Sequence, residues 1–169
     1  MPTSLAGDLR TAPSTLRPFR PDPVQPAALR RAAERARLAS WRLLTITDAE
    51  LRRRIRDAHL AHWQAHLADS GGARILAADR PAGTARELRI ADAFANALHE
   101  VPVHLVVLAR RDGTLPDRLL DHLRDALHAE GLDAAPVPLA RRAEPELREL
   151  LGLPYDLTIH GLLVARPQR

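Results

Sequence analysis

The hydrophobic and polar residues follow two patterns along the chain, and each predicts one kind of element. In some segments apolar residues recur every three or four positions, which gives a helix one apolar face. Elsewhere, short runs of Leu, Ile and Val stand between turn residues, which is typical of strands. The predicted helices cover residues 26–38, 48–67, 84–99, 115–130 and 145–151, and the predicted strands cover residues 41–47, 103–109, 133–140 and 157–165. This order predicts a single α+β domain whose central strands are layered by helices.

The ends of several helices carry recognisable signals. Thr47 and Glu50 have the spacing of a capping box at the start of the second helix. Gly131 and Gly152 are expected to close the fourth and fifth helices, because glycine readily adopts the left-handed conformation found there. The strand at 103–109 (VHLVVLA) is almost continuously apolar, which indicates that both of its faces are covered.

The chain before the first helix is expected to be irregular. Residues 15–24 contain three prolines, so this stretch is predicted to be an extended arm rather than a helix. We therefore expect an N-terminal lead at residues 1–14 and one domain at residues 15–169. The segment 69–83 contains two adjacent glycines and a proline, and it is expected to be a loop or a broken segment.

Composition narrows the class of protein. Hydrophobic residues make up 46% of the chain, but aromatic residues make up only 3%, so a core of small side chains is expected to gain stability by packing against a partner chain. The chain has no cysteine, which excludes disulfides and makes the cytoplasm the expected location. Neither a signal peptide nor an apolar run of membrane-spanning length is visible, so no membrane partner is expected.

The net charge of +4 raises the question of a nucleic-acid partner. All 25 basic residues are arginine, and 21 acidic residues are interspersed among them. Nucleic-acid binding surfaces combine a basic stripe with stacking aromatic residues, and no such stripe is visible here. A basic module that binds anions or nucleic acid is therefore only a weaker alternative.

Histidines form the most conspicuous chemical pattern. His59, His62 and His66 fall on one face of the second helix, a spacing that a metal ion can use. No acidic or cysteine ligand is spaced to complete such a site, so no metal is predicted. His99 and His104 flank the entry to the central strand, where capping of a helix end is expected in preference to acid–base catalysis.

The order of these segments and their amino-acid sequences resemble the nitroreductase family of FMN-dependent oxidoreductases, particularly its actinobacterial members. The resemblance is carried by five stretches that occur in the family's order. They are TLRPFRPDPV, WRLLTITDAELRRRI, FANALHEVPVHLVVLA, EGLDAAPVPLARRAEPELRELLGLP and LTIHGLLVARP. The resemblance implies a nitroreductase-like α+β fold with a central mixed β-sheet flanked by helices, and it implies a dimer.

The resemblance also implies a flavin site and candidate residues for it. FMN needs cations for its phosphate, donors along the edge of its ring and an apolar wall. Arg17 and Arg20 lie in the arm where the family grips the phosphate, and Arg166 or Arg169 would join them from the other end of the chain. Trp41 is a candidate for the cofactor wall, although a tryptophan in a first strand is also a usual core residue. No catalytic residue is assigned.

The chain departs from the family at the places that bind flavin. In the family, a loop rich in Pro, Ser, Asn and Gln joins the first helix to the first strand and holds the flavin ring. Here Ala39 and Ser40 lead directly into Trp41, and Pro13 and Ser14 stand where the family has an arginine and a serine or threonine.

These departures leave two hypotheses open. The chain is an FMN-linked oxidoreductase acting on a small organic substrate, as a homodimer or as a hetero-oligomer in which an intact flavin-binding paralogue completes a shared site. Alternatively, the chain is a pseudoenzyme, a non-catalytic interaction subunit that keeps the fold and binds no flavin.

Overall fold

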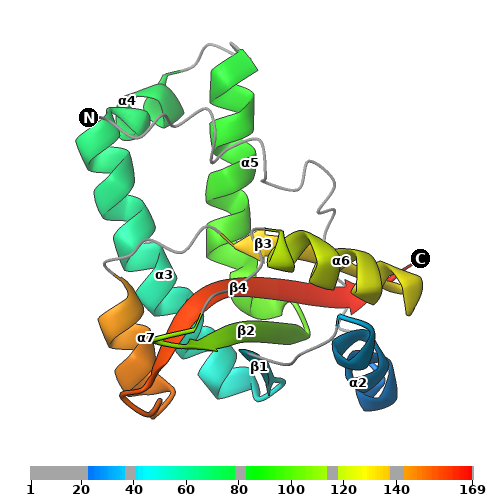
Figure 1. Ribbon diagram of the computed structural model, residues 1–169. Coiled ribbons are helices and arrows are strands. Elements are labelled where there is room, and N and C mark those ends of the chain that lie inside the picture. Colours follow the sequence, from blue (N-terminus) through cyan, green and yellow to red (C-terminus); the bar gives the residue numbers. More distant parts are fainter. Residues whose placement is uncertain (1–22, 37–40, 79–82, 114–117, 138–142, 169) are drawn as a thin grey trace.

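A four-stranded antiparallel sheet forms the centre of the molecule (Figure 1). The structure is a computed structural model that describes residues 23–36, 41–78, 83–113, 118–137 and 143–168. The strands are β1 (Trp41–Ile46), β2 (Val103–Arg110), β3 (Leu132–Val137) and β4 (Leu157–Pro167). Their order across the sheet is β1-β2-β4-β3, so β2 and β4 are the inner strands.

All three strand pairings of the described residues are antiparallel, so the prediction of a mixed sheet is wrong for this part of the chain. The reason lies in the connection between β1 and β2. The chain leaves the sheet after Ile46, and β2 begins beside that point, because Ile46 pairs with His104. A helical excursion that leaves and returns at the same end of the sheet makes the second strand run back along the first.

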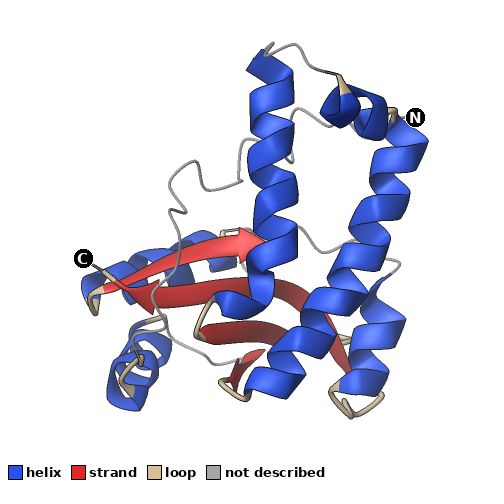
Figure 2. Ribbon diagram, turned by 180° about the vertical axis from the view of Figure 1, so that it is seen from behind, coloured by secondary structure: helices blue, strands red, loops and turns tan. Residues whose placement is uncertain are grey.

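Helices cover both faces of this sheet, which gives three layers (Figure 2). One face carries α3 (Ala49–Ser70), α5 (Gly83–Ala97), the short 3₁₀ helix η1 (Leu98–Glu100) and α7 (Glu144–Leu150). The other face carries α2 (Pro26–Arg35) and α6 (Leu119–Ala129). A short helix, α4 (Gly72–Ala77), lies within the segment predicted to be a loop or broken, at the end of α3 that projects away from the sheet. None of the described helices is long and apolar enough to cross a membrane.

Each face of the sheet has its own apolar cluster. Alternate residues of β2 point to opposite faces, and nearly all of them are buried, as the almost unbroken apolar run predicts. The cluster on the α3–α5–α7 face includes Ile55, Phe94, Val106, Leu147 and Leu162. The cluster on the α2–α6 face includes Leu29, Trp41, Leu105, Leu123 and Leu163.

The predicted helix ends are confirmed in part. Gly131 and Gly152 both have positive φ, of 78° and 60°, after α6 and α7. At the start of α3, however, the N-cap is Asp48 and not Thr47. The side chain of Asp48 accepts a hydrogen bond from the backbone N–H of Leu51 at 2.7 Å, and a carboxylate at that position also interacts favourably with the positive end of the helix.

The last strand runs two residues beyond its predicted end and includes Pro167. The backbone N–H of Gln168 donates to the carbonyl of Gly131 at 2.8 Å, on the β3 side of the strand. Neighbouring residues of a strand point their backbone groups in opposite directions, so the nitrogen of Pro167 faces the β2 side. There β2 has already ended, because its last pair joins Val103 to Ala165. The missing N–H of proline therefore interrupts no pairing.

A bulge in the pairing of β2 with β4 lies next to Gly161, the residue over which α6 packs closely. Val107 pairs with Gly161 and Leu108 pairs with Ile159, which leaves His160 as an extra residue. A Cβ atom on Gly161 would lie 2.8 Å from Cδ1 of Leu120 in α6. Any residue larger than glycine at this position would force the Leu120 side chain or the helix to shift.

Candidate functional site

Two of the five predicted cofactor-binding residues belong to the part of the chain that the structure describes. Trp41 is the first residue of β1, and Arg166 lies near the end of β4. Arg17, Arg20 and Arg169 fall outside the described residues, so their roles stay predictions.

Trp41 lies in the core of the chain. It pairs with Ala109 of β2, its residue is only 5% exposed, and it belongs to the apolar cluster beneath α2 and α6. This position stabilises the sheet through a large buried area. Its role as a cofactor wall stays a prediction.

Arg166 lies beside a carboxylate. By alternation along β4 its side chain is on the sheet face opposite Ala165, which packs in the α2–α6 cluster. Its guanidinium is 3.9 Å from Oδ2 of Asp133, the residue that pairs with it across β3. The side chain is 17% exposed. A phosphate bound by Arg166 would therefore compete with Asp133 for the same cation.

The sheet does not bring Trp41 and Arg166 together. Trp41 pairs with Ala109, whereas Arg166 follows Ala165, which pairs with Val103. Six residues of β2 separate these rows, which corresponds to about 20 Å along a strand. The two side chains are also on opposite faces, so they cannot contact the same group of one flavin.

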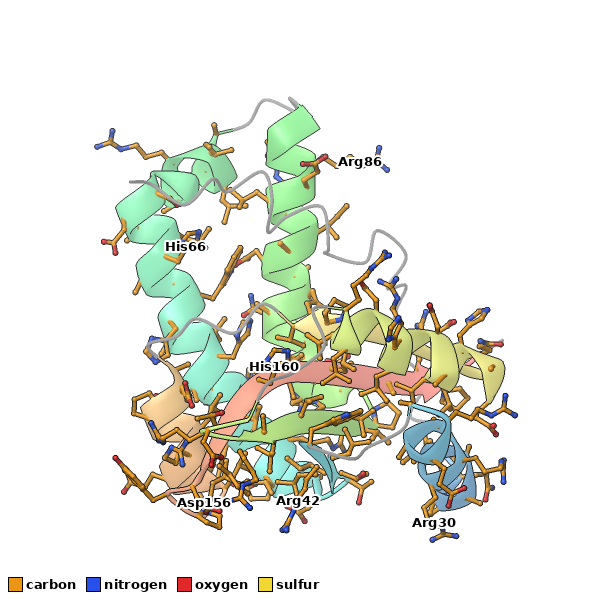
Figure 3. All side chains as sticks on the ribbon, viewed as in Figure 1. Arg30, Arg42, His66, Arg86, Asp156 and His160 are labelled. Atoms are coloured by element: carbon orange, nitrogen blue, oxygen red, sulfur yellow. The ribbon has the colours of Figure 1, made fainter. Side chains whose placement is uncertain are left out.

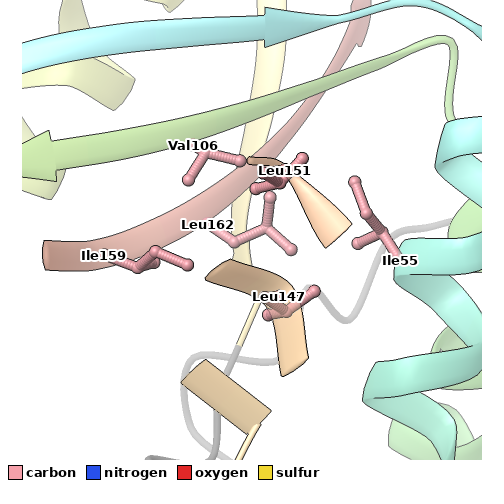
Figure 4. Close-up of a pocket in the computed structure, with 6 residues that line it drawn as sticks. All are labelled: Ile55, Val106, Leu147, Leu151, Ile159 and Leu162. Atoms are coloured by element: carbon pink, nitrogen blue, oxygen red, sulfur yellow. The ribbon is translucent and has the colours of Figure 1, made fainter. Parts of the chain in front are cut away.

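A small apolar pocket lies between α3, α7 and the sheet (Figure 4). Its lining residues are Ile55, Val106, Leu147, Leu151, Ile159 and Leu162. Its volume is about 10 Å³, which is close to the minimum for one water molecule and far below that of a ligand pocket. This pocket has neither the space nor the polar groups for a flavin, so a flavin would need atoms from elsewhere.

Charged residues meet where α6 ends and β3 begins. The carboxylate of Glu130 contacts Nε of Arg31 at 2.7 Å and Nε of Arg35 at 2.9 Å, both from α2. The hydrogen bond from Arg31, followed by the nearby positive charges, lowers the pKa of Glu130. The Glu130 side chain is only 6% exposed, so the carboxylate lies beneath the two arginines.

The end of β4 contacts the same turn. Besides the backbone bond to Gly131, the side-chain amide of Gln168 donates to the carbonyl of His128 at 3.0 Å. The turn at residues 128–133 therefore contacts both α2, which follows the predicted arm, and the end of β4, which carries Arg166. Sequence reasoning missed Glu130, because its partner Arg31 lies 99 residues away in the chain.

A group of polar side chains caps the end of α5 and η1. Arg52 of α3 donates to the carbonyls of His99 at 2.6 Å and Val101 at 2.8 Å. His104 is fully buried, and its Nε2 lies 2.9 Å from the carbonyl of Leu98. Because a carbonyl can only accept, Nε2 carries the proton and donates. The prediction that a histidine here caps a helix end is confirmed.

Burial determines the protonation state of His104 and also affects Arg52. Burial lowers the pKa of His104 to about 4, against the smaller opposing effect of its bond to Leu98. Burial also lowers the pKa of Arg52, with Asp48 acting in the opposite direction. His104 is therefore neutral at pH 7, with Nε2 already engaged, which fits a structural role.

The three histidines of α3 lie in three different environments. His59 is buried, and burial, with a smaller effect of His62, lowers its pKa to about 4. His62 lies 3.5 Å from a carboxylate oxygen of Glu146 in α7, and His66 is exposed beside Trp63 (Figure 3). Among the residues that the structure describes, no three such side chains are grouped so as to hold a metal ion.

The described arginines are spread over the surface rather than gathered into a stripe. Arg30 on α2, Arg42 on β1 and Arg86 on α5 point outward from different parts of the molecule (Figure 3). Several others pair locally, as Arg118 and Arg124 do with Asp121 at 3.8 and 3.6 Å. This arrangement agrees with the mixed, solvated surface that the interspersed charges predict.

No family model and no curated protein matches the sequence. Solved structures do match the fold. An FMN- and NADPH-dependent nitroreductase, NfnB from Sphigopyxis sp. strain HMH, has a TM-score of 0.63 and 20% identity, and the match covers 96% of this chain and 88% of that chain. An oxidised iodotyrosine deiodinase bound to FMN and 3-iodo-L-tyrosine has a TM-score of 0.61 and 19% identity, with 96% and 92% covered.

A third similar structure is the FMN-dependent nitroreductase NfnB from Mycobacterium smegmatis in complex with NADPH. Its TM-score is 0.58 at 17% identity, and the match covers 96% of this chain and 87% of that chain. Each match extends over nearly all of this chain and not only its sheet. The chain therefore has the fold of the FMN-dependent nitroreductase family.

Proposed function

We propose that the chain is a nitroreductase-like, FMN-linked oxidoreductase that reduces or dehydrogenates a small organic substrate in the cytoplasm. The observation that carries this proposal is the likeness of fold, over 96% of the chain, to proteins that are FMN-dependent or bound to FMN. The lack of cysteine agrees with a reducing compartment.

We further propose that the flavin site is shared between chains. The small apolar pocket between α3, α7 and the sheet does not have the volume for a flavin, and Trp41 and Arg166 are too far apart to contact one end of it. Only residues 36–40 join α2 to β1, so the family's ring-binding loop has no counterpart there. A second copy, or an intact flavin-binding paralogue, would supply the missing contacts.

In such a site FMN supplies the redox chemistry, and the protein supplies binding and orientation. Arg17 and Arg20 would hold the phosphate from the arm, with Arg166 or Arg169 as further cations. Trp41 would stabilise the sheet behind the cofactor.

The test is to purify the chain alone, and again together with the products of neighbouring genes, with FMN added to both. A site shared with a paralogue predicts flavin absorbance and fluorescence that co-elute with the complex and are weak or missing in the chain purified alone. A site shared between two copies of this chain predicts flavin in both preparations. If neither preparation retains flavin, the oxidoreductase proposal is wrong.

Arg17 provides a sharper test within a flavin-binding preparation. Replacing Arg17 with Ala should weaken FMN binding by about 1.5–3 kcal/mol, the usual value of a hydrogen bond to a charged group. Titration calorimetry with FMN measures this change. Arg30→Ala is the matched control, because Arg30 lies on α2 with an exposed side chain. Equal affinities for the two variants would remove Arg17 from the phosphate site.

The short junction between α2 and β1 also favours a second candidate function, a non-catalytic interaction subunit. In that case the chain should form a stoichiometric complex with a partner, and neither the complex nor the chain should retain flavin. Flavin bound by the solitary chain would contradict this candidate.

A further inference from the structure

Helix α2 has few apolar contacts with the rest of the molecule. Its buried residues are Ala28, Leu29 and Ala32, and they pack in the cluster on the α2–α6 face. Two of the three are alanines, so the apolar area that they remove from water is small. The position of α2 must therefore depend strongly on its polar contacts.

The main polar contact is made by one carboxylate. Arg31 and Arg35 are one helical turn apart on α2 and both reach Glu130 through Nε, at 2.7 and 2.9 Å. The arginine side chains are 55% and 60% exposed, whereas that of Glu130 is 6% exposed. The arginines thus bridge from the surface to a carboxylate covered by α2.

Glu130 occupies a position that disfavours a negative charge in the absence of α2. It is the C-cap residue of α6, where the unpaired carbonyls make the helix end negative. A carboxylate there destabilises α6 unless a cation compensates it. The two arginines of α2 provide that compensation, so the charge of Glu130 stabilises the molecule only when α2 is docked.

We propose that Glu130 is a positioning residue that fixes α2 against α6, and through α2 the arm at residues 15–24. Residues 15–24, which are predicted to form the arm, immediately precede Gln25, the N-cap of α2, so the orientation of the helix sets the point from which this segment extends. The second half of this proposal rests on the proposed function, because the arm carries the predicted phosphate contacts.

Two substitutions at Glu130 separate docking of α2 from stability of α6. Glu130→Gln removes the charge, and hydrogen exchange in α2 should become roughly fivefold faster, as expected from losing two ion pairs whose arginine side chains are exposed. Glu130→Lys should accelerate exchange in α2 further by repelling both arginines. The same lysine should leave α6 equally or better protected, because a cation is favourable at a helix C-terminus.

Restoring the opposite charge should restore docking. Adding Arg31→Glu and Arg35→Glu to Glu130→Lys should return exchange in α2 towards the wild-type rate. Glu149→Gln is the matched control, since Glu149 lies exposed on α7 and should leave α2 unchanged. If exchange in α2 is the same in all variants, or if α6 loses protection together with α2 in Glu130→Lys, Glu130 does not position α2.

Flavin binding tests the second half independently. In a preparation that binds FMN, Glu130→Lys should lower FMN affinity at least threefold, and the charge-swapped variant should recover it. Faster exchange in α2 without a change in FMN affinity would show that α2 does not position the arm. If the wild-type protein binds no flavin in any preparation, the proposed function fails, and the exchange measurements still decide whether Glu130 docks α2.

Discussion

At the scale of single residues, two buried histidines on the α3–α5 side of the sheet make the stability of the fold sensitive to acid. His59 and His104 are 6% and 0% exposed, and burial lowers the pKa of each to about 4. In the unfolded chain each would have its ordinary pKa of 6.5. The unfolded state therefore binds more protons between these values, so stability rises with pH across this window and falls as the pH is lowered.

This difference predicts a loss of stability of up to about 3 kcal/mol for each histidine as the pH falls from 6.5 to 4. Urea denaturation at several pH values measures it. His104→Gln keeps a donor for the carbonyl of Leu98 but does not titrate, so the slope of unfolding free energy against pH should fall by about half. His66→Gln is the control, because His66 is exposed. An unchanged slope in His104→Gln would show that His104 is not responsible.

The sequence indicates some of these residue roles better than others. His104 precedes a run of buried strand residues, and its role as a helix cap could be predicted from that position. The contact of Glu130 with Arg31 and Arg35 could not be predicted, because no local pattern joins residues that far apart. Likewise, Asp48 and Thr47 are both good N-cap residues, and only the backbone geometry selects Asp48.

At the scale of elements, the packing of α6 on β4 depends on Gly161, which has no side chain. Gly161→Ala should destabilise the fold by about 1–2 kcal/mol, because the new Cβ would overlap Leu120 and the helix or its side chain must shift. Thermal or urea unfolding measures the change. Leu120→Ala combined with Gly161→Ala should recover part of the loss.

A control for this prediction exists at another glycine. A Cβ on Gly83, the first residue of α5, would meet nothing within 4 Å, and φ there is not positive. Gly83→Ala should therefore be neutral or slightly stabilising, since alanine favours helix. If Gly161→Ala behaves like Gly83→Ala, the close approach of α6 does not constrain the sheet.

Hydrophobic periodicity predicts these elements well because each helix buries one face against a continuous sheet. It fails where other forces set the boundary. The residues of α4 show no apolar period long enough to separate a short helix from a loop. The extension of β4 through Pro167 depends on where β2 ends, which only the sheet register reveals.

At the scale of the whole molecule, two layers of helices share one sheet. Trp41 lies in the α2–α6 layer, and Trp63 donates to Oδ1 of Asp92 at 2.9 Å between α3 and α5. Because β2 and β4 contribute to both apolar clusters, the layers should unfold together. Urea transitions followed by fluorescence in Trp41→Phe and Trp63→Phe variants should each match the transition of the same variant followed by circular dichroism. A mismatch would show that the layers unfold separately.

The candidate site is where sequence prediction and structure overlap least. The fold could be predicted from the order of five stretches, because each corresponds to an element that packs on the sheet. Site residues such as Arg17 and Trp41 follow from the resemblance alone, and the structure shows Trp41 in the core. The shared site that we propose would leave little signal in one sequence, since the other chain would supply part of its contacts.

The strand order has a consequence for synthesis on the ribosome. Among the described strands, β4 comes last along the chain and is an inner strand, and β3 pairs with it alone. Until residues 157–167 leave the exit tunnel, β3 has no partner and one edge of the apolar strand β2 is open. A nascent chain therefore exposes this edge of the apolar strand β2 until β4 has been made, and this is the stage at which chaperones would be needed most.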